Sequence, residues 1–119
     1  MPVLPPEVTL VLADYAADRV PDRVVEKAAI KGSLAVLVER APGRSVEVRI
    51  PPYAAVQVIA GTTHRRGTPS AVVEMGPRTW LELVAGHVSW ADAVAAGSVR
   101  ASGARSDLGA WLPLTEEHE

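Results

Sequence analysis

Apolar residues in the first forty positions recur at helical spacing. Two adjacent prolines suit the first turn of a helix, where a missing N–H costs nothing, and we expect that helix over residues 5–18. A second helix is predicted from Pro21 to about Arg40, because apolar side chains keep one face while charged residues take the others. The stretch 41–43, Ala-Pro-Gly, then stops the helix.

The spacing changes to a strand pattern after residue 45. Apolar and charged residues alternate over 46–50, which predicts a half-buried strand. Residues 53–60 are apolar on both faces apart from Gln57, and they predict a more central strand. Residues 61–68 are polar and glycine-bounded, so we expect a hairpin-type connection there, followed by a third strand over 71–75.

Helical spacing returns after the third strand, and we expect one helix that ends at Gly86. A second, over residues 90–96, is predicted to begin at the N-cap Ser89. A short strand over 98–102 and a last helix over 105–112 follow.

This order of elements predicts an α+β fold, with one mostly antiparallel sheet covered by helices. We expect a single domain over residues 1–119. Its N-terminal helices occupy 5–40, its sheet and helix core occupies 45–114, and a charged tail occupies 115–119.

Composition narrows the class of protein. The chain has 119 residues, of which 48% are hydrophobic and 22% charged, so it can bury enough apolar surface to fold. A net charge of −2 gives no basic face for nucleic acid. The absence of cysteine excludes disulfides, thiolate metal sites and a cysteine nucleophile. No run is long enough to span a membrane and no signal peptide is evident, so we expect a cytoplasmic protein without stable membrane insertion.

The usual catalytic and metal-binding motifs are absent. There is no phosphate-binding glycine motif, and His64, His87 and His118 lack the spacing of metal ligands. No serine lies in a nucleophile elbow. We therefore expect no catalytic residues, no metal and no cofactor.

Two polar features leave alternatives open. His64 and Arg66 either clamp an anion on a loop at a pocket mouth or belong to a solvated turn. Glu74 stands alone in an apolar strand, and is either an acid/base group or an ion-paired or solvent-facing residue. Arg49, Arg66 and Arg105 are its candidate partners.

Three tryptophans lie on three successive predicted helices, at Trp80, Trp90 and Trp111. They either fill the core or form the wall of an apolar pocket. Because the chain has no phenylalanine and its other core residues are small, three indoles under one sheet tend to leave an irregular gap. A gap lined by apolar atoms can accept an apolar guest.

The C-terminal half resembles the sterol carrier protein family. The resemblance is carried by the runs 72–86, 88–97 and 99–103, each of which ends at a glycine, and by the helix expected after them. It is closest to small actinobacterial members and to the C-terminal domain of mycothiol-dependent maleylpyruvate isomerases. It covers about residues 45–114.

The resemblance implies a five-stranded, mostly antiparallel sheet with helices on one face and an apolar tunnel between them. It further implies a non-catalytic carrier of a fatty acid, a fatty acyl-CoA or another lipid. The chain lacks the separate metal domain that carries catalysis in the isomerases, so isomerase activity is not transferred to it.

We expect the ligand to lie between the sheet and the helices, against apolar side chains and below two polar ones at the mouth. The candidate ligand-binding residues are Val56, Val58, Val73, Met75, Trp80, Leu83, Val84, Trp90, Val94 and Trp111, with His64 and Arg66 at the mouth. The alternative is an accessory domain with a filled core, which forms a homodimer or docks on a separate enzyme. In that case the strand over 46–50 could pair at an edge of the sheet.

Overall fold

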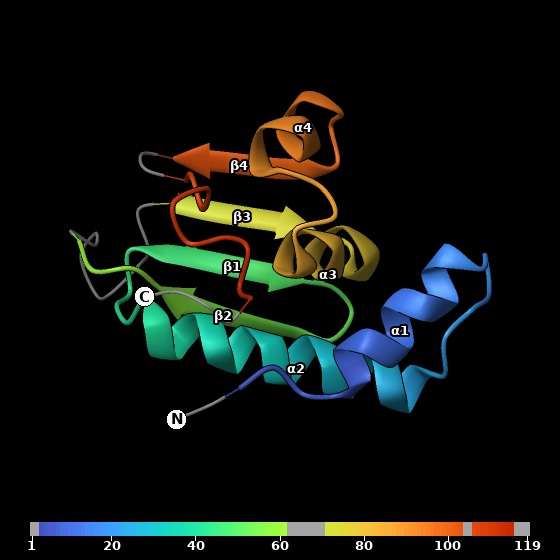
Figure 1. The fold of residues 1–119 in the computed structure, drawn as a ribbon. Coiled ribbons are helices and arrows are strands. Elements are labelled where there is room, and N and C mark those ends of the chain that lie inside the picture. Colours follow the sequence, from blue (N-terminus) through green and yellow to red (C-terminus); the bar gives the residue numbers. More distant parts are fainter. Residues whose placement is uncertain (1–2, 62–70, 104–105, 116–119) are drawn as a thin grey trace.

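The computed structural model describes residues 3–61, 71–103 and 106–115 (Figure 1). Helices and strands follow in the order α1 (Glu7–Ala16), α2 (Arg23–Arg40), β1 (Val46–Ile50), β2 (Ala54–Val58), β3 (Ala71–Met75), α3 (Pro77–Ala85), α4 (Trp90–Ala95) and β4 (Val99–Gly103). The α+β class is therefore as expected.

The sheet differs from the prediction. Over the described residues it has four strands in the order β2-β1-β3-β4, and it is mixed. β1 pairs antiparallel with β2 and parallel with β3, and β3 pairs antiparallel with β4. The prediction of five mostly antiparallel strands is wrong. The hairpin-type connection over 61–68 is also wrong in topology, because β1 lies between the two strands it was expected to join.

The roles of the first two strands are the reverse of those expected. β1 is internal, with β2 on one side and β3 on the other, so it offers no free edge to a partner. β1 nevertheless alternates, because only one face of the sheet is covered: Val48 is buried, whereas Arg49 is exposed. β2 is one of the two edge strands of the described sheet, and its apolar character reflects packing against α2 rather than a central position.

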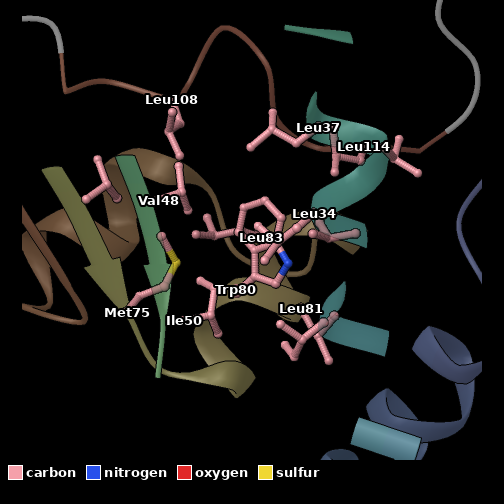
Figure 2. Close-up of a cluster of buried hydrophobic side chains, with 14 of the residues drawn as sticks. Leu34, Leu37, Val48, Ile50, Met75, Trp80, Leu81, Leu83, Leu108 and Leu114 are labelled. Atoms are coloured by element: carbon pink, nitrogen blue, oxygen red, sulfur yellow. The ribbon is translucent and has the colours of Figure 1, made fainter. Parts of the chain in front are cut away.

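The core lies on the covered face of the sheet. Val48 and Ile50 of β1 are fully buried there, beneath Leu34 and Leu37 of α2 and Trp80 of α3. Figure 2 shows Trp80 and Leu83 between the strand residues and α2. Among the described residues, no helix covers the other face of the sheet (Figure 1).

The last predicted helix, over 105–112, is not present in the described residues. Residues 106–115 instead cross the covered face of the sheet with one short turn, drawn in red in Figure 1. Leu108 and Leu114 are both fully buried, six positions apart, which is not a helical repeat. The Asp107 Oδ1 atom accepts a hydrogen bond from the Gly109 N–H at 2.6 Å, and this local bond competes with a helix.

The two N-terminal helices form where expected, and α2 is continuous. Asp22 caps α2 by accepting hydrogen bonds from two backbone N–H groups, at 2.8 and 3.2 Å. α1 is attached to α2 by the Tyr15 hydroxyl, which donates to the Glu26 carboxylate. The Tyr53 hydroxyl donates to the other oxygen of Glu26 at 2.7 Å. Burial, followed by the bond to Glu26, raises the pKa of both phenols.

A backbone clasp joins the end of α2 to the ends of β1 and β2. The Ile59 N–H donates to the Ala41 carbonyl at 2.6 Å, and the Ile59 carbonyl accepts from Ser45 N–H at 3.0 Å. Gly43 passes so close that a Cβ atom there would lie 2.1 Å from the Ile59 carbonyl carbon. Ile59 itself has a φ of +68°, a sterically costly value for a β-branched residue. The clasp is thus held by several backbone bonds against local strain.

Candidate functional site

Trp80 lies in the sealed part of the core. Its side chain is 0% exposed, and its indole N–H donates to the Ser33 Oγ atom at 2.8 Å. Ser33 in turn donates to the Ala29 carbonyl at 2.7 Å, so each buried polar atom in this chain of bonds has a partner. Leu83 and Val84 are also buried. Side chains therefore fill the space in which the sequence placed a ligand, as Figure 2 shows.

The other predicted site residues separate into three groups within the described part of the chain and a fourth group outside it. Val58, Val73 and Met75 are core residues of the sheet. Val94 and Trp111 are 44% and 37% exposed, on the outside of the molecule. Val56 and Trp90 are half-buried, and each lines a hollow described below. His64 and Arg66 lie outside the described residues.

One hollow lies where the C-terminal segment crosses α3 and α4, and we call it the C-terminal hollow. It measures about 480 Å³ and has a mostly apolar lining. Its lining includes the apolar side chains of Leu83, Trp90 and Leu112, and Asp107 supplies a carboxylate. Two of the predicted ligand-binding residues, Leu83 and Trp90, therefore meet at this hollow.

The C-terminal hollow depends on a close approach of two chain segments. A Cβ atom on Gly109 would lie 3.4 Å from Trp90 Cδ1 and 2.9 Å from Asp107 Oδ1, so a larger residue there would press on both. The Leu114 N–H donates to the Val84 carbonyl at 2.9 Å, which fixes the C-terminal segment to the end of α3. The C-terminal segment that lines the hollow is thus attached to α3 by a main-chain hydrogen bond and to the core by the buried side chains of Leu108 and Leu114.

A second hollow of about 430 Å³ lies between α2 and β2, and we call it the α2–β2 groove. Apolar side chains provide most of its surface, and one cation and one carboxylate stand at its ends. Its lining residues are Lys31, Leu34, Ala35, Val38, Glu39, Ala54, Ala55 and Val56. The sequence predicted only Val56 among them. The missed signal is the exposed row of α2, where apolar residues occur on the solvent side of an amphipathic helix.

The uncovered face of the sheet settles the position of Glu74. Its partners in the sheet register are Arg49 on β1 and Arg100 on β4, so the carboxylate stands between two guanidinium groups on the open face. Glu74 is half-buried there, as the solvent-facing alternative expected. Arg49 forms an ion pair with Glu47 at 3.3 Å, and that contact raises the pKa of Arg49. The face shows an alternating row of surface charges rather than an acid/base site.

The described residues contain neither a cluster of potential metal ligands nor a membrane-spanning helix. No group of three or more potential metal ligands occurs in the part of the chain that the structure describes. Among those same residues, no helix is long and apolar enough to cross a membrane.

A comparison with known families places most of the chain in one of them. A family model described as "Bacterial SCP ortholog" matches residues 22–114. The chain belongs to this bacterial sterol carrier protein family. The match includes α2, which the resemblance in the sequence had left out, and so it includes both hollows. A search of the curated proteins found no match.

Proposed function

We propose that this sterol carrier protein relative is a non-catalytic carrier of an apolar or amphiphilic small molecule, such as a fatty acid, a fatty acyl-CoA or another lipid. The observation that supports the proposal best is the C-terminal hollow. Its volume lies within the range of small-molecule sites, and its lining is mostly apolar with few polar side chains.

The ligand position differs from the one expected at the outset. Trp80 and its neighbours close the interior, so the ligand rests against the outer side of Leu83 rather than beside Trp80. Trp90 and Leu112 then cover its two sides. Because the C-terminal segment forms one wall, movement of that segment would let the ligand enter and leave.

The energetics suit reversible binding. Burial of a ~12-carbon chain contributes about 9–10 kcal/mol gross, at about 0.8 kcal/mol for each CH₂ group. The loss of translational and rotational freedom opposes binding by several kcal/mol. The remainder corresponds to dissociation constants in the micromolar range, which suits a carrier that must also release its ligand.

Filling the C-terminal hollow tests the proposal. Ala91 is exposed and lines the hollow, so Ala91→Trp places an indole in the ligand space without disturbing the core. We expect this variant to bind dodecanoate and dodecanoyl-CoA at least about tenfold more weakly than the parent protein, as measured by titration calorimetry. Native mass spectrometry would count the bound molecules.

The matched control is Ala95→Trp, which adds the same side chain to an exposed position of α4 outside the lining. Its affinity should equal that of the parent protein. Failure of the parent protein to bind either compound up to its solubility limit would refute the carrier function. Equal affinity of Ala91→Trp and Ala95→Trp would show that the hollow is not the site.

A further inference from the structure

We propose that the α2–β2 groove is a second binding site, for a single-chain amphiphile with a phosphate-bearing head. It is independent of the C-terminal hollow, because the two hollows share no lining residue. The proposal rests on a row of cations along α2 that continues into the apolar groove.

A smaller hollow of about 310 Å³ lies at the start of α2. That hollow is lined by Arg23, Val24 and Lys27 of α2 and by Pro52 and Tyr53. The α2–β2 groove begins one helical turn later with Lys31, and its strand side begins at the next residue, Ala54. The two hollows therefore follow one another along α2 and the 52–56 segment, and together we call them the furrow.

The positive charges of this furrow lie along the first half of α2. Arg23, Lys27 and Lys31 are four positions apart, so they stand above one another on one side of α2. All three are exposed, and none forms an ion pair with a described residue. The nearby Glu26 carboxylate is engaged by the hydroxyls of Tyr15 and Tyr53.

The opposite end of the furrow is apolar and then acidic. Ala35, Val38 and Val56 supply apolar surface, and the Val38 side chain is 36% exposed on the outer side of α2. Glu39 closes this end, about 12 Å along the axis from Lys31 at 1.5 Å per residue. Its carboxylate repels an anionic head, so an amphiphile would bind with its head at the cations and its chain toward Glu39.

A phosphate head fits the three cations better than a carboxylate. A phosphate monoester carries about −1.5 to −2 charges near pH 7 and offers three acceptor oxygens, whereas a carboxylate carries one charge. Lysine and arginine both donate to phosphate, in charge-assisted hydrogen bonds. The structure therefore favours dodecyl phosphate over dodecanoate, and dodecanoate over the neutral dodecanol.

The test titrates these three compounds as monomers, below the concentration at which they form micelles. We expect dodecyl phosphate to bind the parent protein at least about tenfold more tightly than dodecanol, and added salt to reduce that preference. Lys27→Glu should remove the preference for phosphate. Ala35→Glu, which puts a carboxylate in the apolar end of the furrow, should weaken the binding of all three compounds.

Two controls match these variants. Arg44→Glu changes the net charge as much as Lys27→Glu does, at an exposed site outside the furrow, and it should leave phosphate binding unchanged. Ala13→Glu makes the same substitution as Ala35→Glu, but on the exposed side of α1 and outside the furrow. It should leave the binding of all three compounds unchanged. Residue 27 lies one helical turn from both Arg23 and Lys31, so Lys27→Glu changes the side-chain pairs on this side of α2. Circular dichroism would confirm that the helix persists in the variant.

The outcomes separate this site from the carrier function. Ala91→Trp should retain binding of dodecyl phosphate at the furrow even if it abolishes binding at the C-terminal hollow. Unchanged phosphate binding in Lys27→Glu and Ala35→Glu would overturn the second site, whatever the result at the hollow. Binding to anionic phospholipid vesicles without binding to monomeric dodecyl phosphate would also overturn it, because the furrow would then be a contact with a lipid surface.

Discussion

Trp80 and Trp90 are ten positions apart on successive helices, yet their surroundings differ sharply. Trp80 is fully buried, and its N–H is bonded to Ser33 on another helix. Trp90 is half-buried and faces a hollow across from Leu112. The comparison teaches that an indole closes a core when both its ring and its N–H have partners. Where such partners are lacking on one side, the same side chain can border a site.

Truncation of the two residues gives the largest expected difference. Trp80→Ala should lower the free energy of unfolding by about 3–5 kcal/mol, because it leaves a cavity and removes the partner of Ser33. Trp90→Ala should cost about 1 kcal/mol or less, since its side chain already borders open space. Urea denaturation of both variants measures the two values. Equal losses of unfolding free energy in the two variants would contradict the difference proposed between Trp80 and Trp90.

The hydrogen bond of Trp80 contributes a smaller, separable part. Ser33→Ala should cost about 1–3 kcal/mol, because it leaves the buried indole N–H without an acceptor. The same substitution made in a Trp80→Phe background should cost much less, since no N–H remains to be satisfied. A double-mutant cycle followed by urea denaturation tests this. Identical costs in the two backgrounds would show that the bond does not contribute to the sealing of the core.

The smallest expected effect concerns the attachment of α1, which packs beside this core. Burial and the bond to Glu26 raise the pKa of Tyr15, so the native phenol keeps its proton above pH 10 while the unfolded one loses it. Stability from this group is complete below pH 10 and falls as the pH rises further, by up to about 1.4 kcal/mol per pH unit.

Tyr15→Phe should therefore flatten the decline in stability between pH 10 and pH 11, where the native fold persists. Urea midpoints at several pH values provide the measurement, and Tyr53 remains as an internal reference with its own raised pKa. A decline as steep in Tyr15→Phe as in the parent protein would assign the alkaline sensitivity to other groups. The sealed region around Trp80 would then be independent of the α1 attachment.

Local patterns in the sequence predicted most of the elements. The α3 helix ends at Gly86, which adopts a φ of +80°, and Ser89 accepts a hydrogen bond from the Asp92 N–H at 3.1 Å. Both features depend on residues within four positions of each other, so short-range rules describe them well. The alternation over residues 46–50 likewise located β1 correctly.

Relations between distant residues could not be predicted in this way. Ser33 and Trp80 are 47 positions apart, and no pattern in the sequence joins them. The parallel pairing of β1 with β3 similarly depends on which strands become neighbours. The last helix was mispredicted because Leu108 and Leu114 are drawn into the core by the sheet and α2, which overrides local helical spacing.

The candidate site was predicted in part for the same reason. Leu83 and Trp90 do border a hollow, but the wall formed by Leu112 depends on how the C-terminal segment crosses the molecule. The cations of α2 were visible in the sequence, whereas their alignment with the 52–56 segment was not. Hollows form between elements, and only the tertiary arrangement determines which elements face each other.

The clasp at Gly43 and Ile59 sets the separation between the two walls of the α2–β2 groove. It ties the end of α2 to the strand that walls the groove through main-chain hydrogen bonds and one bond from the Ser45 hydroxyl, and none of these bonds involves a lining residue of the groove. Substitutions of the side chains that line the groove would therefore leave the separation of its two walls unchanged. Related proteins could alter the chemistry of the lining freely while the spacing stays constant, provided that a glycine remains at the clasp.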